Sequence, residues 1–479
     1  MAESHGLHTL THNGALTFAS SNSCLVDFFF KIVRDTPEED IFKLLQECWK
    51  SYPLETLKLI FHLRDTRGGK GEKKAFYSCL IWLEAFHPCS LMKNFDNIPE
   101  YGYFKDFYCL IDSSLEVYVI NYLCEKLKED LSKEVEERSL CSKWLPSENC
   151  SLDKKYGLVK KMCKTLGMTK KEYRKTIVKM REGLNIVEIS MCRNNWDNID
   201  YSKVSSLAFN RYKKAFKKHS PEHFEEFLSK VKEGVAKINT SRLFPHDIIS
   251  QCWRSEYDET IELQWEQFLK SLDIRNLGNS IAVVDVSGSM TSQVGNTTAL
   301  MIAISLGMIC AQLAQGPFKD KWITFSGSPT LESLNGNTLK EKIQNMSTTQ
   351  WEMNTNLQAV FQLILSFAIL YNVPQENLPK TIFIFSDMQF DEACSNNKTN
   401  FEAIEDMYMT YNYRRPKIVF WKIDSKNNDC PIKYDENNCA LLSGYSPELM
   451  KMIIEGEEIS PLTVVMNVIN SPRYSRVVL

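Results

Sequence analysis

Five short runs of apolar residues, rich in β-branched and aromatic types, restrict the possible folds of this chain more than any other feature of its sequence. They lie at 281–284, 322–325, 381–385, 418–421 and 440–442. Segments long enough for helices separate them, at 298–314, 356–371 and 447–454. Because near-continuous apolar strands that alternate with helices are typical of sheets covered on both faces, the pattern predicts a doubly wound parallel sheet.

The part of the chain before residue 275 indicates successive amphipathic helices instead. Thr169 and Glu172, for example, have the spacing of a capping box and precede a helical pattern that carries Ile177 and Met180. Since one helix pair cannot bury its apolar face alone, we expect stacked pairs, as in HEAT-like repeats. The sequence therefore predicts an α-helical repeat domain over 1–275 and an α/β domain over 276–479.

The charge of the chain is unevenly distributed, although its net value is only -3. Residues 151–250 hold 22 Lys and Arg against 11 Asp and Glu, a net charge of +11 between two acidic flanks. Such asymmetry points to a polyanionic partner, and small or single-stranded RNA is the expected one. The alternative is a solvated basic helix face with apolar residues such as Met162 and Leu166 packed behind it.

The residues expected to contact RNA phosphates are cations of the densest basic run, with two weaker candidates upstream. They are Lys160, Lys161, Lys164, Lys170, Lys171, Arg174 and Lys175, then Arg67 and Lys70. Aromatic residues lie among cations in the wider segment, and aromatic faces can stack on unpaired bases. These are Tyr173, Tyr212 and Phe216.

Oxygen-bearing side chains follow three of the predicted strands. The first strand ends in three alternate positions that carry oxygens: Asp285, Ser287 and Ser289. Thr355 precedes a predicted helix, and Asp387 follows the third strand. Ligands of open α/β sheets bind beyond the carboxyl ends of the strands. Carboxylates and hydroxyls are hard donors that suit Mg²⁺ or Mn²⁺ and are poor for zinc. The alternative is a set of capping residues that holds no ion.

This DxSxS motif, with a later Thr and Asp, resembles the metal-ion-dependent adhesion site (MIDAS) of von Willebrand A domains. The resemblance implies that Ser287, Ser289 and Thr355 supply hydroxyl oxygens, while Asp285 and Asp387 hold the ion directly or through water. It also implies that one coordination position stays open for a partner's carboxylate.

Phrases along nearly the whole chain resemble the DUF2828 family of plants and large DNA viruses, in which a helical region precedes a von Willebrand A domain. They begin at Thr11, Leu63, Ile98, Leu243 and Leu442, and the second reads LRDTRGGKGE. The domain order also resembles the Ro autoantigen, in which a ring of helical repeats binds small RNAs. That resemblance implies a Ro-like ribonucleoprotein.

The function expected from these features is non-enzymatic RNA binding by a protein that also has a divalent-metal adhesion site. The alternative is a protein-interaction scaffold whose metal site grips an acidic residue of a protein partner. No nucleophile–base arrangement stands out, so we expect no enzyme. The N-terminus lacks the pattern of a secretory signal and no run suits a bilayer, so we expect no membrane partner. The expected location is cytoplasmic or nuclear, or in the virion if the source is a virus.

Overall fold

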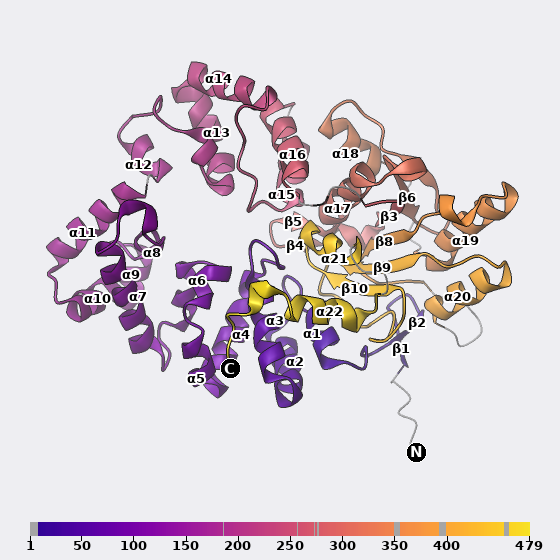
Figure 1. Ribbon diagram of the computed structural model, residues 1–479, viewed down its shortest axis with the longest axis horizontal. Coiled ribbons are helices and arrows are strands. Elements are labelled where there is room, and N and C mark those ends of the chain that lie inside the picture. Colours follow the sequence, from indigo (N-terminus) through magenta and orange to yellow (C-terminus); the bar gives the residue numbers. More distant parts are fainter. Residues whose placement is uncertain are drawn as a thin grey trace. The chain divides into compact units, whose positions relative to one another are not determined.

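A six-stranded sheet in the order β10-β9-β8-β3-β6-β7 forms the centre of the C-terminal part (Figure 1). The computed structural model describes residues 8–184, 186–255, 257–272, 274, 277–348, 355–391, 399–454 and 459–479. The strands are β3 (Ser280–Asp285), β6 (Lys321–Phe325), β7 (Leu331–Ser333), β8 (Thr381–Ser386), β9 (Lys417–Lys422) and β10 (Cys439–Ser443). All neighbours are parallel except β6 and β7, so the predicted strands are confirmed and one antiparallel edge strand is added.

The chain leaves β3 in one direction along the sheet and returns on the other side of it, so the predicted doubly wound topology is confirmed. Because crossovers between parallel strands are right-handed as a rule, the helices before and after this reversal of direction lie on opposite faces of the sheet. The helix α17 (Ala299–Leu313) packs on β3, where Gly307 allows the close approach. A Cβ atom on Gly307 would lie 2.5 Å from a methyl carbon of Val284.

The chain divides into two compact units, and their limits differ from the predicted border between residues 275 and 276, which themselves lie outside the described residues. Unit 1 comprises residues 1–75 and 243–475, and unit 2 comprises residues 76–242 and 476–479. A helical region still precedes the sheet along the chain, as expected. The grouping differs because helices at both ends of the helical region pack against the sheet and its helices.

The first helix shows why the N-terminal segment belongs to unit 1. In α1 (Cys24–Lys31) every residue after the first is buried, and the helix packs on β10 and on α22 (Pro461–Ile469) (Figure 1). Lys31 donates to Asp27 at 3.1 Å and to the carbonyl oxygen of Ala19 at 2.8 Å. The two charged residues of this helix thus satisfy each other, and its many apolar side chains are enclosed by β10 and α22.

The other elements of unit 1 are short hairpins and helices around this sheet. They are β1 (His8–Leu10), β2 (Leu16–Phe18), α2 (Glu38–Ser51), α3 (Pro53–Arg64), α15 (Pro245–Arg254), α16 (Glu259–Ser271), β4 (Gln293–Val294), β5 (Thr297–Thr298), α18 (Leu339–Ser347), α19 (Leu357–Leu370), α20 (Asn400–Thr410) and α21 (Met450–Ile454). The boundary between the units falls within α4 (Lys73–Phe86).

The described residues of unit 2 form helices joined by loops and include no strand. Its helices after α4 are α5 (Pro88–Lys93), α6 (Asn97–Tyr101), α7 (Glu116–Leu131), α8 (Cys141–Trp144), α9 (Ser151–Tyr156), α10 (Leu158–Leu166), α11 (Lys170–Gly183), α12 (Val187–Cys192), α13 (Ser206–His219) and α14 (Pro221–Lys232). The predicted capping box opens α11, since the Thr169 hydroxyl accepts from the Glu172 amide at 3.2 Å and the Glu172 carboxylate accepts from the Thr169 amide at 2.7 Å.

A buried ion pair ties the segment after α3 to the C-terminal part of unit 1. The Asp65 carboxylate is fully buried and accepts from Arg473 Nη2 at 2.6 Å and from the Tyr474 hydroxyl at 3.0 Å. Burial alone would raise the pKa of Asp65, but the hydrogen bonds from Arg473 hold it below its usual value. The stabilising contribution of Asp65 is therefore lost only as the pH falls below about 4.

We expect Arg473→Met to destabilise the protein by about 3–5 kcal/mol, because it leaves the Asp65 carboxylate buried without its cation. Arg476→Met is the matched control, since Arg476 is exposed and lies 3.6 Å from Glu100. Its expected cost is below about 1 kcal/mol. Urea unfolding measures both, and equal costs for the two variants would contradict the structural role of the pair.

Candidate functional site

The first three predicted metal ligands lie together where β3 ends. The Ser287 amide donates to Asp285 Oδ1 at 2.9 Å, and the hydroxyl oxygens of Ser287 and Ser289 are 3.0 Å apart. Ser287 is buried whereas Ser289 is exposed, so the pair opens towards solvent. The motif continues into a 3-10 turn and the β4–β5 hairpin, and α17 begins only afterwards. A strand that turns sharply at its carboxyl end brings these alternate side chains to one place.

Asp387 reaches the same edge from the neighbouring strand. β3 and β8 run parallel with Val284 opposite Phe385, and the Ser386 hydroxyl donates to Asp285 Oδ2 at 2.7 Å. Both oxygens of Asp285 thus accept hydrogen bonds. Burial and then the charge of Asp387 raise the pKa of Asp285 to about 7.

One oxygen of Asp387 has no hydrogen-bond partner among the described residues. Asp387 is 1% exposed, and its Oδ1 accepts from the Gln389 amide at 3.2 Å while Oδ2 is unpaired. Met388 between them has a φ of 66°, in the left-handed region that is unusual for a residue with a side chain. A buried, unpaired carboxylate oxygen is costly, and a strained neighbour that holds it there is typical of a binding site.

Thr355 is hydrogen-bonded to the segment after Asp387. Its hydroxyl donates to the carbonyl oxygen of Gln389 at 2.6 Å, and its amide donates to Asp391. The structure shows no hydrogen bond from Thr355 to Asp285, Ser287 or Ser289 within the described part of the chain. The link between Thr355 and Asp387 therefore runs through Gln389.

A turn near the N-terminus also holds this segment, and the sequence analysis did not identify it. The Thr11 hydroxyl donates to the carbonyl oxygen of Phe390 at 2.6 Å, and the His12 amide donates to the Gln389 side chain at 2.7 Å. Asn13 Nδ2 lies 2.8 Å from the carbonyl oxygen of Gln389 and 3.5 Å from the Thr355 hydroxyl. Because more than 340 residues separate these partners, no local pattern could have revealed the contact.

The oxygen donors fit a hard divalent cation such as Mg²⁺ better than a softer metal. Two serine hydroxyls and an unpaired carboxylate oxygen are ligands that Mg²⁺ and Mn²⁺ accept. Within the described ranges, no three His, Cys, Asp or Glu residues are grouped so that they could hold a metal. A site here would therefore depend on the hydroxyls as well as on carboxylates.

The predicted RNA-contacting cations of α10 and α11 are all exposed, and some of them are paired with acids. Lys161 pairs with Glu116, while Lys170 and Arg174 lie 3.3 and 3.9 Å from Glu148. The remaining four make no ion pair with any described residue. These four form what we call the basic surface: Lys160, Lys164, Lys171 and Lys175.

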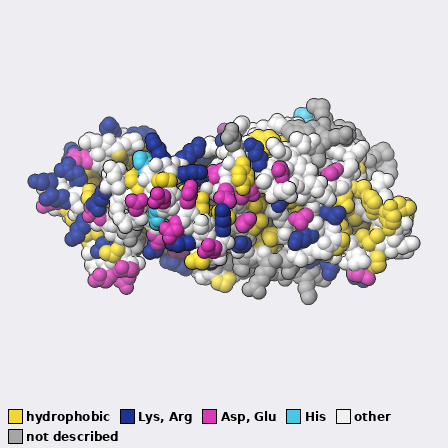
Figure 2. Space-filling model, turned by 90° about the horizontal axis from the view of Figure 1, so that it is seen from above, with side chains coloured by type: hydrophobic (Ala, Val, Ile, Leu, Met, Phe, Trp, Pro, Cys, Tyr) yellow, Lys and Arg dark blue, Asp and Glu magenta, His cyan; other side chains and the backbone are white. Residues whose placement is uncertain are grey.

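The basic surface consists of two stripes with helical spacing. Lys160 and Lys164 are four residues apart on α10, and Lys171 and Lys175 are four residues apart on α11, which packs on α10. Figure 2 shows Lys and Arg side chains gathered at the left end, where Figure 1 places these helices. Like charges at this spacing repel one another, so a bound anion would relieve the repulsion.

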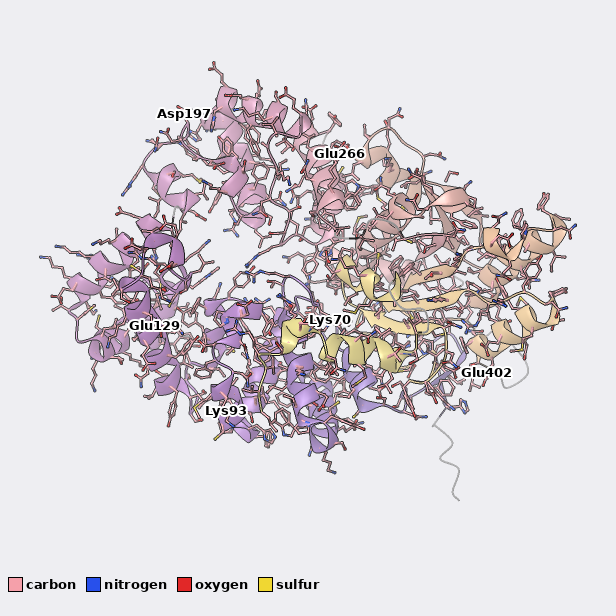
Figure 3. The ribbon with its side chains drawn as sticks, in the orientation of Figure 1. Lys70, Lys93, Glu129, Asp197, Glu266 and Glu402 are labelled. Carbon is pink, nitrogen blue, oxygen red and sulfur yellow. The ribbon has the colours of Figure 1, made fainter. Side chains whose placement is uncertain are left out.

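Lys70 is not available to a phosphate, contrary to the prediction. It is 1% exposed, and its ammonium donates to the carbonyl oxygens of Phe29 and Ile32 and, at 2.7 Å, to the Ser443 hydroxyl (Figure 3 labels Lys70). Burial lowers the pKa of Lys70 to about 7. Lys70 is a structural residue of unit 1, whereas Arg67 is exposed.

The proposed stacking role of two aromatic residues is also wrong. Tyr173 is 1% exposed and its hydroxyl donates to the carbonyl oxygen of Pro146 at 2.9 Å. Phe216 is fully buried beside Tyr201 and Phe224, and Tyr212 is half-buried. These side chains form the apolar side of the basic helices, as the alternative interpretation of the run expected.

Two family models match the chain, and both describe domains of unknown function. DUF2828 matches residues 11–121 and 164–278, and DUF7788 matches residues 279–470. The uncharacterized protein L728 of Acanthamoeba polyphaga mimivirus is 29% identical over 503 residues, which cover 96% of this chain and 87% of that protein. The Ro (RSR) protein of Deinococcus radiodurans aligns at 13% identity and a TM-score of 0.46, covering 91% of this chain and all of that one.

None of the described helices combines the length and the apolar character needed to cross a membrane.

Proposed function

We propose that this chain, of which residues 11–121 and 164–278 match the DUF2828 model, is a non-enzymatic RNA-binding protein with a separate divalent-cation site. The observation that carries RNA binding is the basic surface, in which four exposed lysines on two neighbouring helices have no acidic partner in the part of the chain that the structure describes. Backbone phosphates of a single strand are the polyanion that such stripes fit, because they repeat along a flexible chain.

The cation site is proposed from the unpaired carboxylate oxygen of Asp387 beside the serine hydroxyls. Asp387, Ser287 and Ser289 would hold Mg²⁺ or Mn²⁺, with Asp285 directly or through water, and Thr355 would complete the set as in an adhesion site. The bound ion would supply a positive centre that accepts a further oxygen ligand. Because Asp387 is buried and Ser289 is exposed, the site would be closed to solvent at Asp387 and accessible from solvent at Ser289.

A second candidate function uses this open side. Because Ser289 is exposed, an acidic side chain of a protein partner could reach the ion, and the protein would then act as a scaffold. The two functions differ in what they require: RNA binding depends on the lysines of unit 2, and scaffolding depends on the cation.

The deciding experiment titrates a short fluorescent single-stranded RNA with the whole protein across a salt series, with and without Mg²⁺. Four phosphate contacts predict that log K falls against log salt with a slope of about -3. Binding that is independent of Mg²⁺ assigns the RNA to the basic surface alone. Absence of binding at about 50 mM salt would overturn the RNA-binding function and favour the scaffold.

The affinity for Mn²⁺ is expected to rise with pH between about 5 and 7. Since burial and Asp387 raise the pKa of Asp285 to about 7, protons compete with the cation below that pH. One displaced proton corresponds to at most about tenfold in affinity per pH unit. Isothermal titration calorimetry at several pH values measures the change, and an affinity that is flat over this range would contradict a role for Asp285.

A further inference from the structure

A third buried carboxylate lies at the same sheet edge and follows a strand that the adhesion-site motif does not include. Asp424 comes two residues after β9 and is 3% exposed. The Ile423 amide donates to the carbonyl oxygen of Ser386 at 3.2 Å. In the parallel pair β8–β9, Ser386 lies opposite Lys422, which are the last residues of the two strands. Asp387 and Asp424 are the first carboxylates after these strand ends.

The two oxygens of Asp424 are used differently. Oδ1 accepts from the Lys426 amide at 3.3 Å, whereas Oδ2 accepts no hydrogen bond from any residue that the structure describes. The Lys426 ammonium is 3.9 Å from Oδ2 and donates to the carbonyl oxygen of Ser289 at 3.1 Å. Because one ammonium contacts both groups, Oδ2 faces the side on which Ser289 lies.

The charges at this edge favour a cation between the strand ends. Burial and then the charge of Asp387 raise the pKa of Asp424 to about 6, so the two carboxylates repel each other. Each has one buried oxygen without a hydrogen bond. Asp285 differs, since both of its oxygens already accept hydrogen bonds. Among the described residues, the carboxylate oxygens available at this edge therefore belong to Asp387 and Asp424.

We propose that Asp424 is a further ligand of the divalent cation, directly or through water. When the ion is absent, the Lys426 ammonium partly neutralises the negative charge of this carboxylate. The inference rests on the proposed cation site and extends it from the ends of β3 and β8 to the end of β9. The Lys426 side chain is 49% exposed, so it can swing into solvent when the ion enters. Asp424 thereby adds a second carboxylate with a free oxygen to Asp387 and the serine hydroxyls, and hard oxygens of this kind suit Mg²⁺ or Mn²⁺.

The test measures the Mn²⁺ affinity of the whole protein in four forms: wild type, Asp424→Asn, Lys426→Met and Asp429→Asn. Asp424→Asn is expected to weaken binding about 10- to 100-fold, the usual effect of an oxygen that supports a metal. Lys426→Met is expected to tighten it about fivefold, because a positive charge close to the ion is removed. Asp429→Asn changes a half-buried carboxylate of the same loop and is expected to leave the affinity unchanged.

The outcomes separate this inference from the proposed function. If the wild type binds Mn²⁺ and Asp424→Asn binds it equally well, the role of Asp424 is overturned while the cation site stands. If the wild type does not bind Mn²⁺, the cation site itself is overturned, and Asp424 with it. Circular dichroism verifies folding, and if Asp424→Asn does not fold, an unchanged or weaker affinity of Lys426→Met overturns the inference.

Discussion

Asp387→Asn is expected to weaken Mn²⁺ binding at least about 100-fold and to stabilise the cation-free protein. The substitution keeps the size of the side chain but removes its charge and the unpaired oxygen at the ion's position. Because an unpaired buried carboxylate costs about 1–3 kcal/mol or more, the cation-free variant should unfold at higher urea. With millimolar Mg²⁺ the order should reverse, since only the wild type gains the binding free energy.

This reversal in the order of stability of variant and wild type on adding Mg²⁺ distinguishes a cation ligand from a carboxylate with a structural role only. Asp435→Asn serves as the control, because Asp435 is an exposed carboxylate of unit 1 and should change neither quantity. Calorimetry gives the affinity, and urea unfolding with and without Mg²⁺ gives the stability. A variant that is less stable than the wild type in both conditions, with unaltered Mn²⁺ affinity, would show that Asp387 has a packing role only.

Reversing the charge of the basic surface is expected to reduce RNA affinity about 100- to 1,000-fold at about 50 mM salt. The four-residue variant replaces each lysine by Glu: Lys160, Lys164, Lys171 and Lys175. The salt dependence should nearly vanish, because its slope counts the phosphate contacts that the lysines make. The helices should persist, since their buried faces carry Met162, Tyr173 and Ile177, which the variant leaves intact.

The control for this variant changes the net charge equally but on unit 1. It replaces by Glu four exposed lysines that are scattered over that unit: Lys43, Lys50, Lys319 and Lys380. Screening limits the reach of each charge to about 10 Å at 0.1 M salt, so the control should keep most of the affinity and the slope. Equal losses in both variants would show that the affinity depends on net charge, and the basic surface would lose its role.

The strands were predictable because their apolar runs are continuous and buried on both faces. All five expected runs lie within β3, β6, β8, β9 and β10. The edge strand β7 was missed, since its three residues, Leu331–Ser333, include charged and polar types and are at most partly buried. The joining of the N-terminal helices to the sheet was missed as well, because an apolar helix such as α1 does not specify which surface covers it.

Local spacing also determined part of the candidate site. Ser287 and Ser289 meet because residues two apart at a turning strand end point the same way, and this can be read from the order of the residues. Asp424 could have been found by the rule that led to Asp387, applied to the next strand. The burial of Lys70 could not have been predicted. A lysine in a glycine-rich loop can face solvent equally well, and only the fold brings it to the buried carbonyl oxygens that accept its hydrogen bonds.

The sequence by itself determined the strands, the helices of the basic run and the hydroxyl motif, since each depends on residues within one turn or one strand. Tertiary structure alone decided which charges are exposed, which carboxylate oxygens lack a partner, and which distant segments surround Thr355. These properties arise from contacts such as those of Asn13 with Gln389, between residues far apart in the chain. Burial and pairing depend on what packs against a side chain, and that is settled only when the whole chain folds.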